Sequence, residues 1–186
     1  LPMSKKAKML VRTDGKIVGT VGGGCLEADV WAEAKQVMES GEPTLQRFIL
    51  TEKHAGDDGL NCGGNVEIFT EPVAAGHSEE ILKEVASIRA ERGSAVLATL
   101  VSGGEKDGWC SKLLVKDDGA TVGTLGYREA DQAVHAALED EDGIPEDLLQ
   151  VVELEVDRPE GQETLKVFME SICPEPTLYL FGGGHV

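Results

Sequence analysis

Two short glycine–cysteine stretches contain the residue types that could do chemistry in this sequence. They are Gly22-Gly23-Gly24-Cys25 and Cys62-Gly63-Gly64. Backbone amides at a helix start bind anions, and glycines let a ligand approach the backbone closely. A thiol at a helix start is stabilised as its thiolate by the helix dipole, which makes it reactive. The first stretch therefore has three interpretations: a plain turn, a cradle for an anion, or a mount for the thiol of Cys25.

Other polar residues near these stretches give weaker signals. Glu27 would lie in the first turn of the helix and compete with an anion for its dipole. The segment 51–64 is long, polar and glycine-rich, as binding loops tend to be, and its His54 could lie near the second stretch. The cysteines and histidines lack the paired spacing of a zinc site, so we expect no metal. Cys110 and Cys173 have no glycine context, and we interpret them as structural.

The elements that would position these stretches occur twice in the chain. Residues 8–22 align with residues 112–126 without a gap, and nine of the fifteen positions are identical. We interpret this as the duplication of an α/β unit that contains a hairpin, a helix and two further strands. In the first unit the hairpin turns at Asp14-Gly15, and the helix ends at Gly41. One face of that helix carries apolar residues at helical spacing: Leu26, Val30, Ala34, Val37 and Met38.

The remaining elements are predicted from the same patterns. Strands are expected at 45–50 and 65–71 in the first unit and at 149–155 and 164–170 in the second. The second unit should have a helix at 127–139 and a strand at 94–101 before its hairpin, and a helix at 78–92 should join the units. The counterpart of the strand at 94–101 would lie before residue 1 in the first unit. A sheet without that strand exposes unpaired backbone, so we expect either dimerisation, for example by strand exchange, or marginal stability.

The two copies differ at the glycine–cysteine stretches. Gly22 is kept as Gly126, whereas the next three residues of the second copy are Tyr127, Arg128 and Glu129. The second copy also has no counterpart of Cys62-Gly63-Gly64. A turn and a helix can therefore form without these residues. Because both stretches are present in one copy and missing from the other, we predict one shared site in the first unit.

Composition excludes several classes of function. The net charge is −17, which disfavours nucleic acid and acidic membrane surfaces as partners. No apolar stretch approaches the roughly 20 residues of a membrane span, and no secretory leader is recognisable. Four cysteines are too few for a secreted disulfide framework. The sequence favours a cytoplasmic protein with reduced thiols.

We predict three regions of α/β class with mixed sheets. The first unit covers 1–76, the second, degenerate copy with its linking helix covers 77–174, and residues 175–186 read as an apolar strand running into a glycine turn. A strand followed by a glycine turn normally opens a nucleotide-binding βαβ unit. We interpret the last region as the truncated start of a Rossmann domain.

With these residues in view, the sequence resembles the XdhC/CoxI family, the xanthine dehydrogenase accessory factors. The resemblance rests on residues 7–34, 62–72 and 167–186, which follow each other in family order. It implies an N-terminal α/β region bearing both glycine–cysteine motifs and a C-terminal Rossmann domain. The motif positions that it carries over are Gly22, Gly23, Gly24, Cys25, Cys62, Gly63, Gly64, Gly182, Gly184 and His185.

The resemblance also implies a function. Family members bind the molybdenum cofactor (molybdopterin), help it acquire a sulfido ligand from a cysteine desulfurase, and deliver it to a xanthine dehydrogenase-like molybdenum hydroxylase. Cys62 or Cys25 would be the catalytic thiol, and a thiolate suits molybdenum or a transferable sulfur. We expect a homodimeric cofactor chaperone rather than an enzyme. The alternatives are a thiol-based sulfur carrier, an NAD(P)-dependent oxidoreductase that uses the Rossmann domain, or a plain interaction module.

Overall fold

The computed structural model describes residues 6–50, 64–73, 79–104, 110–139, 143–158 and 161–174. Within these residues, the first unit contains one helix and four strands, which are β1 (Met9–Val11), β2 (Ile17–Gly19), α1 (Cys25–Ser40), β3 (Thr44–Leu50) and β4 (Gly64–Thr70). The described part of the second unit contains two helices and five strands. They are α2 (Glu79–Glu91), β5 (Ala95–Ser102), β6 (Lys112–Lys116), β7 (Thr121–Thr124), α3 (Arg128–Glu139), β8 (Leu149–Arg158) and β9 (Gly161–Ile172).

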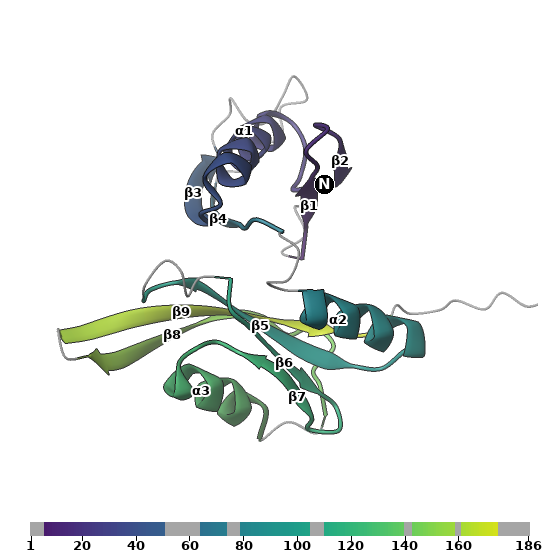
Figure 1. The fold of residues 1–186 in the computed structure, drawn as a ribbon, viewed down its shortest axis with the longest axis vertical. Coiled ribbons are helices and arrows are strands. Elements are labelled where there is room, and N and C mark those ends of the chain that lie inside the picture. The colour runs from purple at the N-terminus through teal and green to yellow at the C-terminus, as the bar shows by residue number, and fades with distance from the viewer. Residues whose placement is uncertain are drawn as a thin grey trace, which may run out of the picture.

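The second unit is a five-stranded sheet with the order β7-β6-β5-β9-β8. In the first unit β1 pairs with β2 and β3 pairs with β4, as two separate two-stranded sheets. The predicted α/β class is confirmed, and Figure 1 shows the two units as separate bodies. The sequence predicted mixed sheets, whereas every strand pairing among the described residues is antiparallel. The predicted Rossmann strand at 175–186 lies outside the described residues.

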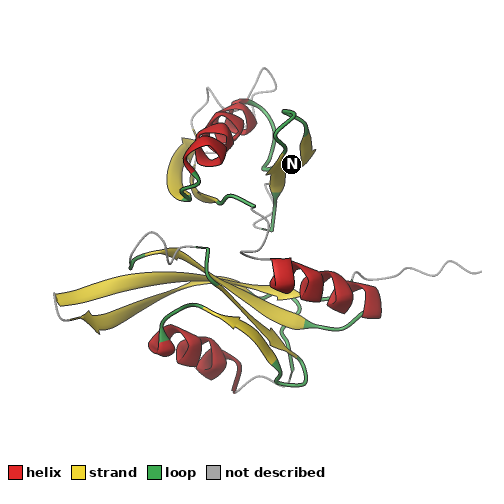
Figure 2. Cartoon of the chain, viewed as in Figure 1, coloured by secondary structure: helices red, strands yellow, loops and turns green. Residues whose placement is uncertain are grey.

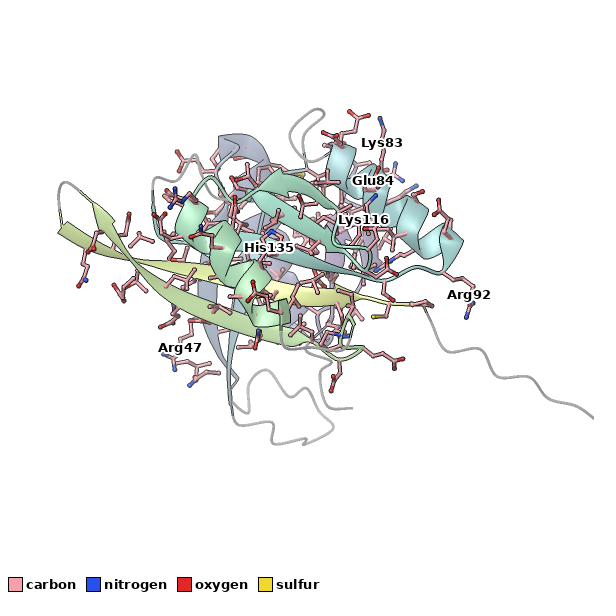
Figure 3. All side chains as sticks on the ribbon, turned by 90° about the horizontal axis from the view of Figure 1, so that it is seen from below. Arg47, Lys83, Glu84, Arg92, Lys116 and His135 are labelled. Carbon is pink, nitrogen blue, oxygen red and sulfur yellow. The ribbon has the colours of Figure 1, made fainter. Side chains whose placement is uncertain are left out.

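Helices cover both faces of the five-stranded sheet (Figure 2). Alternate residues of β5 point to opposite faces, as in any strand. Val96, Ala98 and Leu100 pack in a cluster with α3, while Ala95 and Leu97 pack with α2. The ion pair between Lys116 Nζ and Glu84 Oε2, at 2.6 Å, also ties β6 to α2 (Figure 3). Because β5 is buried on both faces, it forms the centre of the core.

The hairpin turns of the two copies have the same hydrogen bonds. Gly15 N donates to Arg12 O at 2.9 Å, and Lys16 N donates to Asp14 Oδ1 at 3.1 Å. In the second copy the aligned bonds are Gly119 N to Lys116 O at 3.0 Å and Ala120 N to Asp118 Oδ1 at 2.9 Å. The predicted Asp-Gly turn is confirmed in both copies.

Helix α1 follows its predicted boundaries with one difference on its buried face. Gly41 ends the helix with φ 72°, and its N–H donates to Val37 O at 2.9 Å. The expectation that Met38 belongs to the buried face is wrong, because Met38 is exposed. Glu33 is buried instead. The buried face of α1 therefore keeps four of the five predicted residues and has Glu33 in place of Met38.

Two ion pairs join the first unit to the second. Lys112 Nζ contacts Glu71 Oε1 at 2.8 Å, and Lys8 Nζ contacts Glu170 Oε1 at 2.5 Å. Lys8 aligns with Lys112, and Glu71 aligns with Glu170 in the matching stretches 66–71 and 165–170. Each lysine thus pairs with the glutamate of the other copy. This reciprocity is the pattern of a two-fold symmetric interface, here between two copies in one chain.

Candidate functional site

The turn before α1 is fixed by a hydroxyl that bonds on both sides. Thr20 Oγ1 accepts from Gly22 N at 3.0 Å and donates to the carboxylate of Glu27. The second copy repeats the arrangement: Thr124 Oγ1 accepts from Gly126 N at 3.0 Å and donates to Asp131 Oδ2 at 2.6 Å. Glu27 therefore holds the turn. The sequence indicated only that its carboxylate would compete with an anion for the helix dipole.

The backbone of the first-copy turn differs from that of the second copy. Gly22, Gly23 and Gly24 all have positive φ, at 125°, 82° and 70°. In the second copy Gly126 has φ 81°, and the next two residues, Tyr127 and Arg128, are outside the positive region. Residues with a side chain are strained at positive φ, so the first-copy turn requires glycine where the second does not.

The glycine turn is open on one side. A Cβ placed on Gly23 would meet nothing within 4 Å, so no neighbouring atom requires a glycine at this position. Gly24 is the N-cap of α1 and provides no side-chain cap. Cys25 is the first residue of the helix and is exposed. The turn thus presents accessible backbone and a thiol at the positive end of the helix dipole, which suits an anionic group.

The last residue of the second glycine–cysteine stretch, Gly64, is described, and the strand that it begins packs near the first stretch. Gly64 is the first residue of β4 and pairs with Leu50. Val66, two residues later, packs in one cluster with Val21 and Leu26, which flank the first stretch. The residues Cys62, Gly63, His54, Gly182, Gly184 and His185 lie outside the described residues. The shared site of the two stretches stays a prediction.

The other two described cysteines have different surroundings from Cys25. Cys110 is buried and Cys173 is half-buried. Burial, followed by the neighbouring carboxylate of Glu71, raises the pKa of the Cys110 thiol to about 12. A thiol that stays protonated is a poor nucleophile, so Cys110 fits the packing role that its sequence context indicates.

The rest of the described chain offers one pocket away from the glycine–cysteine turn, no metal-binding cluster and no membrane-spanning helix. A shallow pocket of about 420 Å³ lies in the second unit between α3 and the β6–β7 turn, lined in part by Lys116 and His135, and it contains none of the glycine–cysteine residues. Among the described residues, no group of three or more His, Cys, Asp or Glu side chains is placed to hold a metal ion. No helix in the described part of the chain is long and apolar enough to span a membrane.

The fold and the site define a duplicated α/β protein with a glycine–cysteine turn in the first copy. The model of the XdhC and CoxI family matches residues 6–48. The match covers β1, β2, α1 and most of β3, including the first glycine–cysteine stretch. It confirms the resemblance that the sequence indicated.

Two known proteins are similar to the chain. Over 63 residues it is 41% identical to the uncharacterized protein YqeB of Escherichia coli (strain K12), which is 34% of this chain and 12% of that protein. A crystal structure described as a xanthine dehydrogenase from Bacillus halodurans matches with a TM-score of 0.60 and 20% identity. That match covers 90% of this chain and 43% of the solved chain, and it shows a shared fold. The chain therefore spans less than half the length of either protein.

Sequence reasoning missed the residues that hold the turn and the unit interface. Thr20 and Glu27 were visible as part of the repeat, as were Lys8 and Glu71. Their recurrence as Thr124, Asp131, Lys112 and Glu170 was the available signal. A pairing between copies could not be read from it, because an alignment of repeats does not show which copy a side chain contacts.

Proposed function

We propose that the chain is part of an accessory protein that binds the molybdenum cofactor during maturation of a molybdenum hydroxylase. The observation that carries this proposal is the difference between the two turns. The residues that hold the turn are shared, as Thr20 with Thr124 and Glu27 with Asp131. The three residues that differ give the first copy open space at Gly23 and an exposed thiol at Cys25, which the second copy lacks. Because the second copy forms its turn and helix without these residues, a ligand is the best explanation for their presence in the first.

The residues of the turn fit an anionic, sulfur-bearing cofactor. Positive-φ glycines with open space at Gly23 let a phosphate or a pterin ring approach the backbone amides at the start of α1. Cys25 supplies a soft sulfur ligand suited to molybdenum. Molybdopterin, when bound, supplies the dithiolene that holds the metal. Within this arrangement the chain positions the cofactor and offers its thiol, with Cys62 as the proposed second thiol.

The partners follow from the same proposal. The family segment at residues 6–48 and the fold shared with a protein described as a xanthine dehydrogenase support a hydroxylase of that type as the recipient. A cysteine desulfurase as the sulfur donor, and a homodimer as the working form, complete the proposal. NAD(P) binding would belong to the Rossmann domain that residues 175–186 are proposed to begin.

One experiment tests the cofactor proposal. The protein is purified from molybdenum-replete cells, and its bound molybdenum and oxidised-pterin fluorescence are quantified. Cys25→Ala and Cys62→Ala are expected to lose most of both signals, whereas Cys173→Ala, as the matched thiol control, is expected to keep them. Pterin that stays in both variants, or a Cys62→Ala protein that still supports a fully active sulfurated hydroxylase, would overturn the assignment.

The exposure of Cys25 favours one alternative, the thiol-based sulfur carrier. A carrier holds a persulfide, which intact-mass measurement detects as a gain of one sulfur atom on Cys25 or Cys62. Protein that carries this sulfur but no pterin would replace the cofactor chaperone with the sulfur carrier. NAD(H) binding without pterin would instead favour the oxidoreductase.

A further inference from the structure

Tyr127 of the second unit stands at the sequence position of Gly23 in the first unit. The turns that carry these two residues are held in the same way, because the hydroxyls of Thr20 and Thr124 each accept a hydrogen bond from the amide two residues later. The two positions can therefore be compared on a common backbone frame. On that frame, one unit has a large aromatic side chain where the other has none.

The side chain of Tyr127 fills a space inside the second unit. It is half-buried and packs against the core cluster that α3 forms with the five-stranded sheet. It also reaches the residues that follow β5, because a Cβ placed on Gly104 would overlap the Tyr127 hydroxyl. The aromatic ring is therefore held between the turn and the end of β5.

The first unit leaves the corresponding space open. A Cβ placed on Gly23 would meet nothing within 4 Å. The hydrophobic cluster beside the turn consists of Val21, Leu26 and Val30, and the partly buried residues packed against it come from β1, β3 and β4. Among the described residues, no side chain thus takes the place at the turn that the Tyr127 ring takes in the second unit.

The first-unit turn also leaves a backbone donor without an acceptor. In the second unit Asp131 Oδ1 accepts from Leu125 N at 2.8 Å. In the first unit the aligned Glu27 bonds the hydroxyl of Thr20. No described residue accepts from the N–H of Val21, which aligns with Leu125 and is 7% exposed. A buried N–H without an acceptor costs free energy, so this donor points to a ligand that carries an acceptor atom.

We propose that the open space at Gly23 binds the planar ring of the ligand, in the place that the Tyr127 side chain takes in the second unit, and that the Val21 N–H donates to an acceptor at the edge of that ring. The inference rests on the proposed function and assigns the pterin ring, rather than a phosphate, to this position. An aromatic ring fills the aligned place in the second unit, which favours a ring as the occupant. A pterin also carries ring nitrogens and a carbonyl oxygen that can accept from Val21.

A tyrosine at position 23 tests the proposal, because it gives the first unit the residue that the second unit has. The matched control is Gly119→Tyr, since Gly119 has the same φ of +82° and equally open surroundings in another turn. The protein is produced in cells that do not make molybdopterin, and binding of free pterin, which has the ring but no phosphate, is measured by its fluorescence. We expect Gly23→Tyr to weaken this binding by about tenfold or more and Gly119→Tyr to leave it unchanged.

A second measurement on the unsubstituted protein uses the two aligned amides. Titration with free pterin should shift the NMR signal of the Val21 amide and leave that of the Leu125 amide in place. Should Gly23→Tyr fail to fold, Gly23→Asn replaces it, because asparagine tolerates positive φ, and it should weaken pterin binding several-fold. Pterin binding of equal strength in the folded variant, or a Val21 signal that inorganic phosphate shifts and pterin does not, would overturn the proposal.

Failure of the proposed function gives a different result. Protein purified from molybdenum-replete cells would then carry no pterin, while free pterin that binds the unsubstituted protein and is lost in Gly23→Tyr would still support a ring site at Gly23. Conversely, bound cofactor that Cys25→Ala releases and Gly23→Tyr retains would leave the proposed function in place and remove the ring from Gly23.

Discussion

The two units of this chain start from one design and differ in what surrounds it. Residues that both copies keep have hydrogen-bond partners in the structure. The turn aspartates accept from the backbone amide two residues later, and the hydroxyls of Thr20 and Thr124 bond on both sides of the turn before the helix. Residues that only the first copy has, Gly23, Gly24 and Cys25, lie on an open edge. The comparison teaches that the shared residues explain the fold, and that the unshared ones need a different explanation.

The largest expected effect separates the two reciprocal ion pairs. Lys112 is buried beside Glu71, so Lys112→Met should lower the free energy of unfolding by about 3 kcal/mol, because it leaves a partly buried carboxylate without its cation. Lys8 is mostly exposed but its partner Glu170 is buried, so Lys8→Met should cost about 2 kcal/mol, less than Lys112→Met because water can still reach the Lys8 end of the pair. Urea unfolding of the chain measures both. Equal losses of unfolding free energy would mean that the two ion pairs are equally buried in solution.

A glycine shared by the copies gives the next effect. A Cβ on Gly123 would lie 2.4 Å from Lys112 O and 2.7 Å from Ile81 Cδ1, at φ +82°. Gly123→Ala should therefore cost about 3 kcal/mol from strain and overlap together. Gly119→Ala has the same φ and open space, and should cost about 1 kcal/mol. Thermal unfolding of both variants checks the difference, and similar melting temperatures would show that the hairpin relaxes around the added methyl.

Most elements of the fold could be predicted from the sequence, because local signals agree with the tertiary structure. The Asp14-Gly15 turn, the Gly41 helix end and the boundaries of α1 follow from short-range chemistry that the duplication repeats. The burial of Glu33 in place of Met38 could not be predicted, since it depends on what packs against the helix. The order of strands in the sheets also could not be predicted, because it is set by pairing between segments far apart in the sequence.

The candidate site could be predicted only as a set of residue types. The positive φ values at Gly22, Gly23 and Gly24 agree with the glycine-rich turn in the sequence. The role of Glu27 as a bond to Thr20 could not be read from spacing, because a carboxylate in a first turn can serve the helix dipole or a neighbouring hydroxyl. The structure decides between these roles, because it shows the hydroxyl of Thr20 bonded to the carboxylate of Glu27.

The alkaline pH dependence of stability gives a smaller effect, which comes from Cys110. The pKa of Cys110 is raised from 9.0 to about 12, so the folded state holds this proton more tightly than the unfolded state. Its contribution to stability is fully present below pH 9 and is lost as the pH rises towards 12. Cys110→Ala should therefore flatten the fall of the melting temperature over this range. A slope identical to that of the unsubstituted protein would contradict the burial of Cys110.

The smallest expected effect on stability is the most informative about the turn. Gly23 and Gly126 both have positive φ, 82° and 81°, and a Cβ on either would meet nothing within 4 Å. Gly23→Ala and Gly126→Ala should therefore each cost about 1 kcal/mol of backbone strain, measured by urea unfolding. In protein purified from molybdenum-replete cells, only Gly23→Ala should lower the amount of bound pterin, because only the first-copy turn is proposed to hold the cofactor. Equal pterin loss in both variants would mean that strain alone releases the cofactor, and the difference between the copies would then no longer support a binding site.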